Sequence, residues 1–267
     1  MKTAAILAAG ALLATSAFAA PGTEARWANH AERRAGRAGR RSGFKLPAEE
    51  NGLEAVNGTD RNVEYSSNWA GAVLSSTGFT SVVGTIIVPT PKASGKSASA
   101  SAWVGIDGDT CGTAILQTGM DFTVSSSGAV SYDAWYEWYP DYAYDFTGFS
   151  VKAGDEVKIT VTASSKAAGT ATLQNLTTGK SISHSFSNEK NQLCEYDAEW
   201  IVEDYESGGS LVTFANFDSV TFTSASAVKS GATVGVTGAS ILDIKQGSSV
   251  LTSCSTSGSS TVTCSYV

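Results

Sequence analysis

The sequence is poor in the residues that most hydrolases use for catalysis. It contains only two histidines, of which His184 alone lies beyond residue 62. Neither a G-x-S-x-G turn nor an H-E-x-x-H zinc motif occurs, and the string nearest to an Asp-Thr-Gly turn is Asp109-Thr110-Cys111. A serine triad, a zincin and a pepsin-like dyad are therefore excluded. We interpret His184 as a surface strand residue.

Arginine is absent after Arg61, and this absence divides the chain by charge. Residues 1–61 hold nine Lys and Arg against six Asp and Glu, whereas residues 62–267 hold nine against 19. The run Arg33–Arg41 has no apolar periodicity and cannot bury a core. We therefore expect residues 20–61 to form a basic, largely disordered pro-segment. The acidic remainder argues against a nucleic-acid partner.

Long apolar runs are missing after the first residues. Lys2, the apolar stretch Ala4–Ala14 and the small-residue exit Ala17–Ala19 have the form of a secretory signal peptide over residues 1–19. This stretch is too short to span a membrane as a helix. We expect a secreted, extracellular protein with no membrane partner, whose residues 62–267 are numerous enough for one sizeable core.

The cysteines lack the C-x-x-C spacing of a zinc site. Four are present, Cys111, Cys194, Cys254 and Cys264. An even number in a secreted protein predicts two disulfides rather than a metal site, and we expect no metal and no cofactor. The spacing favours Cys254 with Cys264 across a terminal hairpin, which leaves Cys111 with Cys194. A sequon at Asn175 predicts a glycan on a surface loop.

The sequence after Asn62 lacks the apolar stripe of an amphipathic helix over three turns. It instead contains about a dozen short alternating or β-branched runs at roughly ten-residue spacing, separated by Gly, Ser, Thr and Asn clusters. In Glu156–Ala163, for example, every second residue from Val157 is apolar. This pattern predicts an all-β fold, a single antiparallel β-sandwich of two sheets.

The stretch Tyr132–Pro140 combines carboxylates with large aromatic residues. In a strand, alternate side chains project to the same face, so Asp133, Trp135, Glu137 and Tyr139 lie together. A face that mixes Trp, Tyr and carboxylates is typical of a substrate cleft, although a solvated face with scattered aromatics fits the same pattern.

Two further polar residues lie in apolar strands. In Ala198–Glu206, Glu203 alternates with apolar residues, so it is expected to be partly buried with a raised pKa that suits acid–base chemistry. Gln117 closes the apolar run that begins at Ala114. From the residues alone, a buried amide satisfied by the backbone is the simpler interpretation of Gln117.

The remaining chemistry leaves three alternatives. One is a peptidase that uses carboxylates and amides. Another is a secreted glycoside hydrolase that uses Glu137 and Glu203, with the carboxyl groups about 5 to 5.5 Å apart if retaining and about 6.5 to 9.5 Å if inverting. The third is a lectin-like binding module in which the aromatic rings serve as stacking platforms.

Five ordered motifs distinguish these alternatives because together they resemble the fungal glutamic peptidases, the eqolisins. The resemblance covers nearly all of residues 62–267. The motifs are Ser67-Asn68-Trp69-Ala70-Gly71, Trp103-Val104-Gly105-Ile106-Asp107-Gly108, Ile115-Leu116-Gln117-Thr118-Gly119, the stretch Tyr132–Pro140, and Glu199-Trp200-Ile201-Val202-Glu203-Asp204.

The resemblance implies an acid-active, pepstatin-insensitive endopeptidase with a concanavalin-like sandwich and a concave cleft that binds a peptide. It implies secretion as a zymogen, with the pro-segment as an intramolecular inhibitor and a mature start near Asn62; we expect a monomer. The catalytic residues of the family fall on Gln117 and Glu203. Its substrate-binding residues fall on Trp69, Asp107, Asp133, Trp135, Glu137 and Tyr139.

The mechanism implied by the resemblance needs no metal and no covalent intermediate. Glu203, ionised in the resting enzyme, takes a proton from a water that attacks the peptide carbonyl and returns it to the leaving amine. Gln117 orients the water and donates to the oxyanion. The chain departs from the family in the loop after Glu203, where Ser207–Ser210 replaces a segment that carries a further disulfide in relatives.

Overall fold

The computed structural model describes residues 40–48 and 63–267. The chain divides into two units, Met1–Ala35 and Gly36–Val267, and the first lies outside the described residues. The predicted signal peptide and the predicted mature start near Asn62 lie outside them as well. Everything that follows concerns the second unit, whose described part contains strands and no helix, and therefore no helix that could cross a membrane.

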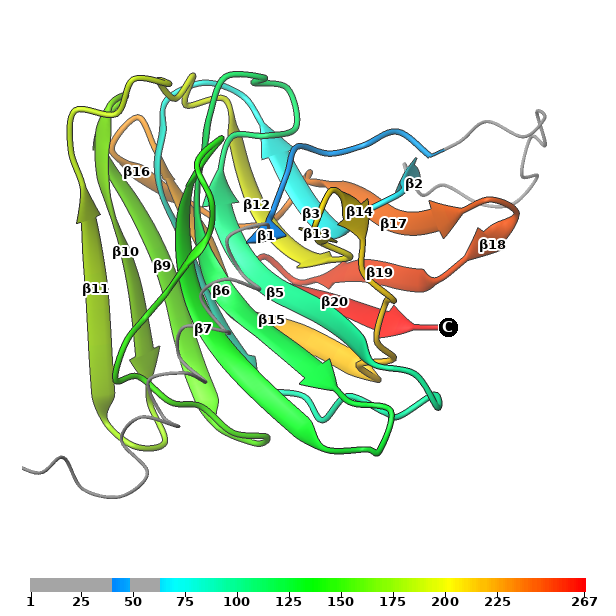
Figure 1. The fold of residues 1–267 in the computed structure, drawn as a ribbon. Helices are drawn as coiled ribbons and strands as arrows, with labels where there is room; N and C mark the ends of the chain where they lie inside the picture. Colours follow the sequence, from blue (N-terminus) through cyan, green and yellow to red (C-terminus); the bar gives the residue numbers. More distant parts are fainter. Residues whose placement is uncertain (1–39, 49–62) are drawn as a thin grey trace, which may run out of the picture. The chain divides into compact units, whose positions relative to one another are not determined.

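Two large sheets form the sandwich that the alternating runs predict (Figure 1). The pairs within them are antiparallel, apart from the parallel pair of β2 with β17. The eight-stranded sheet has the order β11-β10-β9-β4-β15-β20-β19, with β16 beside β15. Its strands are β4 (Phe79–Ile87), β9 (Glu156–Ser165), β10 (Ala168–Asn175), β11 (Lys180–Phe186), β15 (Ser219–Lys229), β16 (Ala232–Val234), β19 (Thr252–Ser257) and β20 (Thr261–Tyr266).

The nine-stranded sheet carries the predicted catalytic residues. Its order is β18-β17-β3-β12-β5-β6-β7-β8, with β2 beside β17. Its strands are β2 (Val63–Ser66), β3 (Trp69–Ser75), β5 (Ala98–Ile106), β6 (Ile115–Val124), β7 (Val130–Tyr139), β8 (Tyr144–Asp145), β12 (Asp197–Glu203), β17 (Ser240–Gln246) and β18 (Ser249–Val250).

The hydrophobic core lies between the two sheets and follows the period-two pattern of the strands. In β9, Val157, Ile159 and Val161 are fully buried, while the residues between them are not. In β5, the even-numbered residues from Ala98 to Ile106 belong to the same core. Because side chains alternate along a strand, the odd-numbered residues of β5 face the opposite side of the nine-stranded sheet, here called the outer face.

The outer face has an apolar cluster of its own, separate from the core between the sheets. Trp69, Trp103, Trp135 and Ile201 are fully buried in it, and Trp69 packs edge-on against Trp103 with ring centroids 5.0 Å apart. Tryptophans buried on the outer face of a sandwich require a cover. Residues 40–48 provide part of it, as Phe44 belongs to the same cluster.

A third, small sheet pairs the start of residues 40–48 with the segment that follows β12. It has the order β1-β13-β14, with β1 at Arg40–Arg41, β13 at Glu206–Ser207 and β14 at Ser210–Leu211. Arg40 lies opposite Ser207, in the loop that follows the predicted catalytic Glu203. In Figure 1, β1 (blue) lies beside β13. The prediction of disorder across residues 20–61 thus differs from the structure at residues 40–48, which we call the docked segment.

Both predicted disulfides are confirmed. Cys254 pairs with Cys264 between the adjacent strands β19 and β20, and Cys111 pairs with Cys194 across 83 residues. The second bond joins the loop after β5 to the segment that leads into β12. The Cys111–Cys194 bond therefore ties together two connections at one end of the β5–β12 strand pair, where Ala198 lies opposite Ile106.

Candidate active site

The predicted dyad residues lie on the outer face and converge on the docked segment. Gln117 is in β6 and Glu203 is in β12, and both are fully buried. The Nε2 of Gln117 donates to the carbonyl oxygen of Ser42 at 2.7 Å. Ser42 also interacts with the carboxyl of Glu203. The two side chains therefore meet at one residue of a bound stretch of peptide, as the dyad hypothesis requires.

The two carboxyl oxygens of Glu203 differ in their hydrogen bonds. Its Oε2 accepts a hydrogen bond from Nε1 of Trp103 at 2.8 Å, while its Oε1 has no hydrogen-bond partner among the described residues. Burial raises the pKa of Glu203 to about 8, although Ser42, Arg40 and the two indoles of Trp103 and Trp69 oppose this rise. Covered by the docked segment, Glu203 is thus protonated in acid, which differs from the ionised resting state that the family mechanism implies.

Glu137 is the neighbour of Gln117 in the adjacent strand. The two residues are register partners between β6 and β7. The Oε2 of Glu137 accepts from Nε2 of Gln117 at 3.3 Å and from the backbone N–H of Ser42 at 3.2 Å. Burial raises the pKa of Glu137 well above its ordinary value, Arg40 and Ser42 oppose this rise, and the nearby Glu203 and Asp121 add to it. Glu137 therefore helps to hold the peptide backbone next to Gln117.

The side chain of Arg40 is buried close to the dyad. Its Nε and Nη2 donate to the two carboxylate oxygens of Asp121 at 2.7 and 2.6 Å, and Nη2 also donates to Ser101 at 3.2 Å. The guanidinium carbon lies 4.1 Å from the ring centroid of Trp135 and 4.5 Å from that of Tyr205. A bidentate ion pair between two aromatic faces is a specific site for a guanidinium group.

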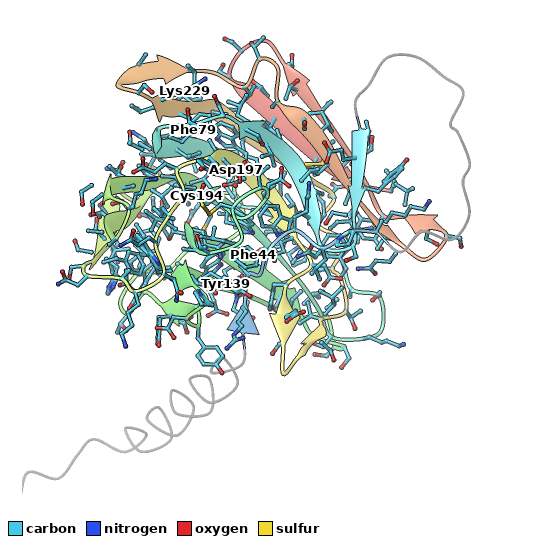
Figure 2. The ribbon with its side chains drawn as sticks, turned by 90° about the horizontal axis from the view of Figure 1, so that it is seen from above. Phe44, Phe79, Tyr139, Cys194, Asp197 and Lys229 are labelled. Carbon is cyan, nitrogen blue, oxygen red and sulfur yellow. A yellow bond between two sulfur atoms is a disulfide. The ribbon has the colours of Figure 1, made fainter. Side chains whose placement is uncertain are left out.

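The other end of the docked segment is bound through its backbone and one ring. Phe44 packs edge-on against Tyr139 with ring centroids 4.6 Å apart, and Figure 2 shows the two side chains side by side. The side chain of Asn68 accepts from the N–H of Leu46 at 2.9 Å and donates to the carbonyl of Phe44 at 3.1 Å. Lys45 forms ion pairs with Asp109 and Glu64. The segment is therefore anchored on both sides of Ser42.

Several of the predicted cleft residues contact the docked segment. Trp135, Glu137 and Tyr139 do so directly, and Trp69 lies beside Trp103 in the apolar cluster under it. Asp133 is half-buried and lies opposite Asp121 in the register of β6 and β7. The predicted face of β7 is thus the outer face of the sheet.

Asp107 has contacts of a different kind. Its two carboxylate oxygens accept four backbone N–H groups, those of residues 194, 195, 196 and 197, at 2.6 to 3.2 Å. Burial raises the pKa of Asp107 and these four bonds oppose the rise. The contacts of Asp107 fix the start of β12 rather than a bound peptide, so they lend no support to its prediction as a substrate-binding residue.

Asn175 is placed where a glycan would not fit. The prediction put it on a surface loop, but it ends strand β10 and is 1% exposed. Its Nδ2 donates to Asp155 at 2.8 Å and its Oδ1 accepts from the N–H of Thr178 at 3.0 Å. Because the nitrogen that would carry the sugar is buried and bonded, the structure contradicts the predicted glycan.

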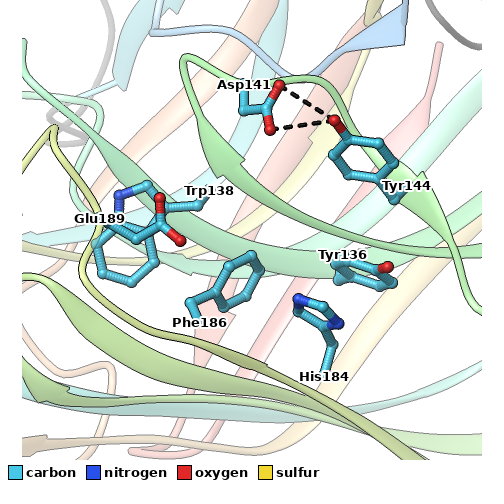
Figure 3. A pocket seen from close by; sticks show the side chains of 7 residues that line it. All are labelled: Tyr136, Trp138, Asp141, Tyr144, His184, Phe186 and Glu189. Carbon is cyan, nitrogen blue, oxygen red and sulfur yellow. Dashed lines mark hydrogen bonds between the residues drawn. The ribbon is translucent and has the colours of Figure 1, made fainter.

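A hollow of about 270 Å³ lies outside this site, between β7 and β11 (Figure 3). Tyr136 and Trp138 project into it from the side of β7 opposite to Glu137. His184 stacks on Tyr136 with centroids 3.9 Å apart, and burial lowers the pKa of His184. His184 is therefore half-buried against an aromatic ring, not a plain surface residue, and the hollow does not include the dyad.

Among the residues that the sequence reasoning missed, three in β5 and β6 contact the dyad or Arg40. Trp103 donates to Glu203, while Ser101 and Asp121 bind Arg40. All three stand at odd positions of β5 and β6, in step with Gln117. Alternation along these two strands was the signal that could have found them.

An outer face that binds a peptide strand and aims a carboxamide and a carboxyl group at one of its residues defines a peptidase. Comparison with known proteins agrees. Residues 67–266 match the model of the Peptidase A4 family. The chain is 52% identical over 287 residues to aspergillopepsin-2 of Aspergillus niger, with all of both chains covered. It is 45% identical over 273 residues to scytalidopepsin B of Scytalidium lignicola, covering 99% of this chain and 98% of the relative.

The fold of this chain is similar to that of a solved glutamic peptidase. Scytalido-glutamic peptidase with a transition state analog inhibitor matches with a TM-score of 0.69 and 47% identity, over 75% of this chain and 98% of that one. The chain belongs to the Peptidase A4 family, the eqolisins. It is a glutamic endopeptidase, and the glycoside hydrolase and lectin alternatives are not favoured.

Proposed function

We propose that this endopeptidase is secreted as a zymogen, works in acid, and hydrolyses peptide bonds with Gln117 and Glu203 as its catalytic residues. The observation that supports the dyad most directly is the 2.7 Å hydrogen bond from the Gln117 carboxamide to a peptide carbonyl oxygen. The substrate is a protein or peptide that takes the place of the docked segment on the outer face.

The chemistry that we propose uses one water molecule. Glu203 takes a proton from the water as its oxygen attacks the carbonyl carbon, and a proton passes to the leaving nitrogen. Gln117 donates to the oxygen on which negative charge develops, and a carboxamide does so without a charge of its own to desolvate. When the docked segment leaves and water enters, the burial that raises the pKa of Glu203 is relieved, so the carboxyl can ionise and act as the base.

Latency follows from the same contacts. The docked segment covers Gln117, Glu137 and Glu203, which are fully buried beneath it. Its main anchor is the ion pair of Arg40 with Asp121. Residues 1–61 hold nine basic against six acidic residues and residues 62–267 nine against 19, so the two parts of the chain attract each other at neutral pH. Protonation of carboxylates in acid weakens this attraction, so acid should loosen the segment and self-cleavage should follow.

The test is to replace each dyad residue and measure casein hydrolysis in acid, with pepstatin present. Gln117→Ala and Glu203→Ala should each abolish hydrolysis, by a factor of at least about 10³ for loss of a group that acts in the transition state. Circular dichroism and the melting temperature establish that each variant is folded. A folded variant with wild-type turnover would remove that residue from the mechanism.

A further inference from the structure

The docked segment binds in the way that an extended peptide substrate binds. Its strand β1 adds to β13 by antiparallel pairing, with Arg40 opposite Ser207 and Arg41 opposite Glu206. Main-chain pairing with a strand edge holds a peptide independently of its sequence, while side-chain pockets select the register.

One side chain fixes the register of this peptide. Arg40 is 2% exposed and is held by Asp121, Ser101 and the ring of Trp135. A shift by one residue would remove the guanidinium from its carboxylate, and Arg41 cannot replace it because the alternation of the strand directs Arg41 elsewhere. Arg41 in fact lies over the ring of Tyr142, 4.5 Å from its centroid.

In this register the dyad faces a single peptide bond. The carbonyl oxygen of Ser42 accepts from Gln117 at 2.7 Å, and its N–H donates to Glu137 at 3.2 Å. The amide that follows this carbonyl is that of Gly43. The Oε1 of Glu203 is buried and has no hydrogen-bond partner in residues 40–48 and 63–267, and Ser42 lies close enough to this carboxyl to lower its pKa.

We propose that the bond between Ser42 and Gly43 is the first bond that this enzyme hydrolyses, and that it does so within its own chain. This inference rests on the proposed function of Gln117 and Glu203. It assigns a specific cleavage site within the pro-segment. The docked segment is then a bound substrate that has not yet been cut, and not only an inhibitor.

The step consumes one water. The water oxygen bonds to the carbonyl carbon of Ser42, and the bond from that carbon to the nitrogen of Gly43 breaks. Once the segment has loosened enough for water to enter, Glu203 ionises, takes a proton from the attacking water and passes it to the Gly43 nitrogen, so it ends the step ionised as it began. The products are a carboxyl group on Ser42 and an amine on Gly43.

The two products leave the site differently. The piece that ends at Ser42 is then held by the contacts of Arg40, Arg41 and Ser42 and by the β1–β13 pairing. The piece that begins at Gly43 remains part of the main chain and keeps the contacts of Phe44, Lys45 and Leu46. A second cut nearer to Asn62, where the mature start is predicted, is then needed to clear the site.

The experiment uses the full chain purified at neutral pH, acidified, and quenched at successive times for intact-mass analysis and N-terminal sequencing. We expect the first new N-terminus to be Gly43 and its rate of appearance to be unchanged on dilution, as for a reaction within one molecule. A first N-terminus at any other residue, or a rate proportional to concentration, would overturn the proposal.

Two leader variants form a matched pair. Arg40→Ala removes the buried anchor and should slow the appearance of the Gly43 N-terminus by at least about tenfold. Arg41→Ala removes a half-buried neighbour that has no ion pair with a carboxylate within 4 Å in the described residues, and should leave this rate within about twofold. Equal rates in the two variants would contradict the register. Casein hydrolysis distinguishes the two hypotheses. Loss of all acid proteolysis would contradict the proposed function. Hydrolysis of casein together with a first cut at another bond would contradict only the assignment of the bond between Ser42 and Gly43.

Discussion

Replacing Asp121 by asparagine should release the docked segment from the outer face. The change leaves the shape of residue 121 nearly intact and removes the charge that pairs with Arg40 at 2.6 Å. Both side chains are 2% exposed. Removing one partner from a buried ion pair costs about 3 to 5 kcal/mol, because the remaining charge stays in a poorly solvated place. Glu137, 3.8 Å from the guanidinium, retains part of the attraction, so the lower end of that range applies.

A loss of about 3 kcal/mol corresponds to a roughly 150-fold larger population of the undocked segment. Trypsin reports this population, because it cleaves after Arg40 and Arg41 only when β1 has left β13, and the cleavage rate follows the open population if the segment opens and closes quickly. The assay is carried out at neutral pH on the Glu203→Ala chain, which cannot cut itself, with the fragments identified by mass.

The control for this prediction is Asp218→Asn. Asp218 forms an ion pair with Lys92 at 2.8 Å, but its side chain is 72% exposed. Exposed pairs contribute about 0 to 1 kcal/mol, so cleavage after Arg40 or Arg41 should change by no more than about fivefold. If Asp121→Asn accelerates cleavage no more than Asp218→Asn does, Arg40 is not the anchor that the contacts indicate.

Two further predictions concern buried groups of β5 and β12. Glu199 is fully buried, neither of its carboxyl oxygens has a hydrogen-bond partner in the described part of the chain, and burial raises its pKa well above 4.5. The stability that its proton supplies is present below pH 4.5 and is lost as the pH rises through the raised value. Glu199→Gln in the Glu203→Ala chain should therefore raise the melting temperature at neutral pH and leave it nearly unchanged in acid; equal gains at both pH values would refute this. Trp103→Phe removes the N–H group from which Glu203 accepts a hydrogen bond. We expect kcat/KM to fall by about 10- to 100-fold and the pKa of Glu203 in the pH profile to rise. A lower kcat/KM with an unchanged pH profile would mean that Trp103 contributes packing alone.

The fold and one face of the site could be predicted because both depend on local alternation. The pattern of Tyr132–Pro140 correctly placed Trp135, Glu137 and Tyr139 on one face, since neighbouring side chains in a strand point to opposite sides. The disulfide between Cys254 and Cys264 was predictable for a similar reason, as the two residues face each other across one hairpin.

The docking of residues 40–48 could not be predicted from local pattern. It depends on Arg40 meeting Asp121, 81 residues away, in a pocket built from three strands and a loop. Composition predicts that Arg33–Arg41 cannot form a core, but a segment without a core can still be ordered by binding to another surface. Asn175 failed for a related reason, because a sequon does not encode whether its amide is buried against Asp155.

The most direct measurement of whether Gln117 and Glu203 act together is a double-mutant cycle. Acid hydrolysis of a fluorogenic peptide is compared for Gln117→Ala, Glu203→Ala and the double variant, each shown to be folded. Groups that act on one carbonyl as a unit are strongly non-additive, so the double variant should lose about as much kcat/KM as the more damaged single variant. Losses that multiply would show that the carboxamide and the carboxyl group work independently, and would contradict the dyad.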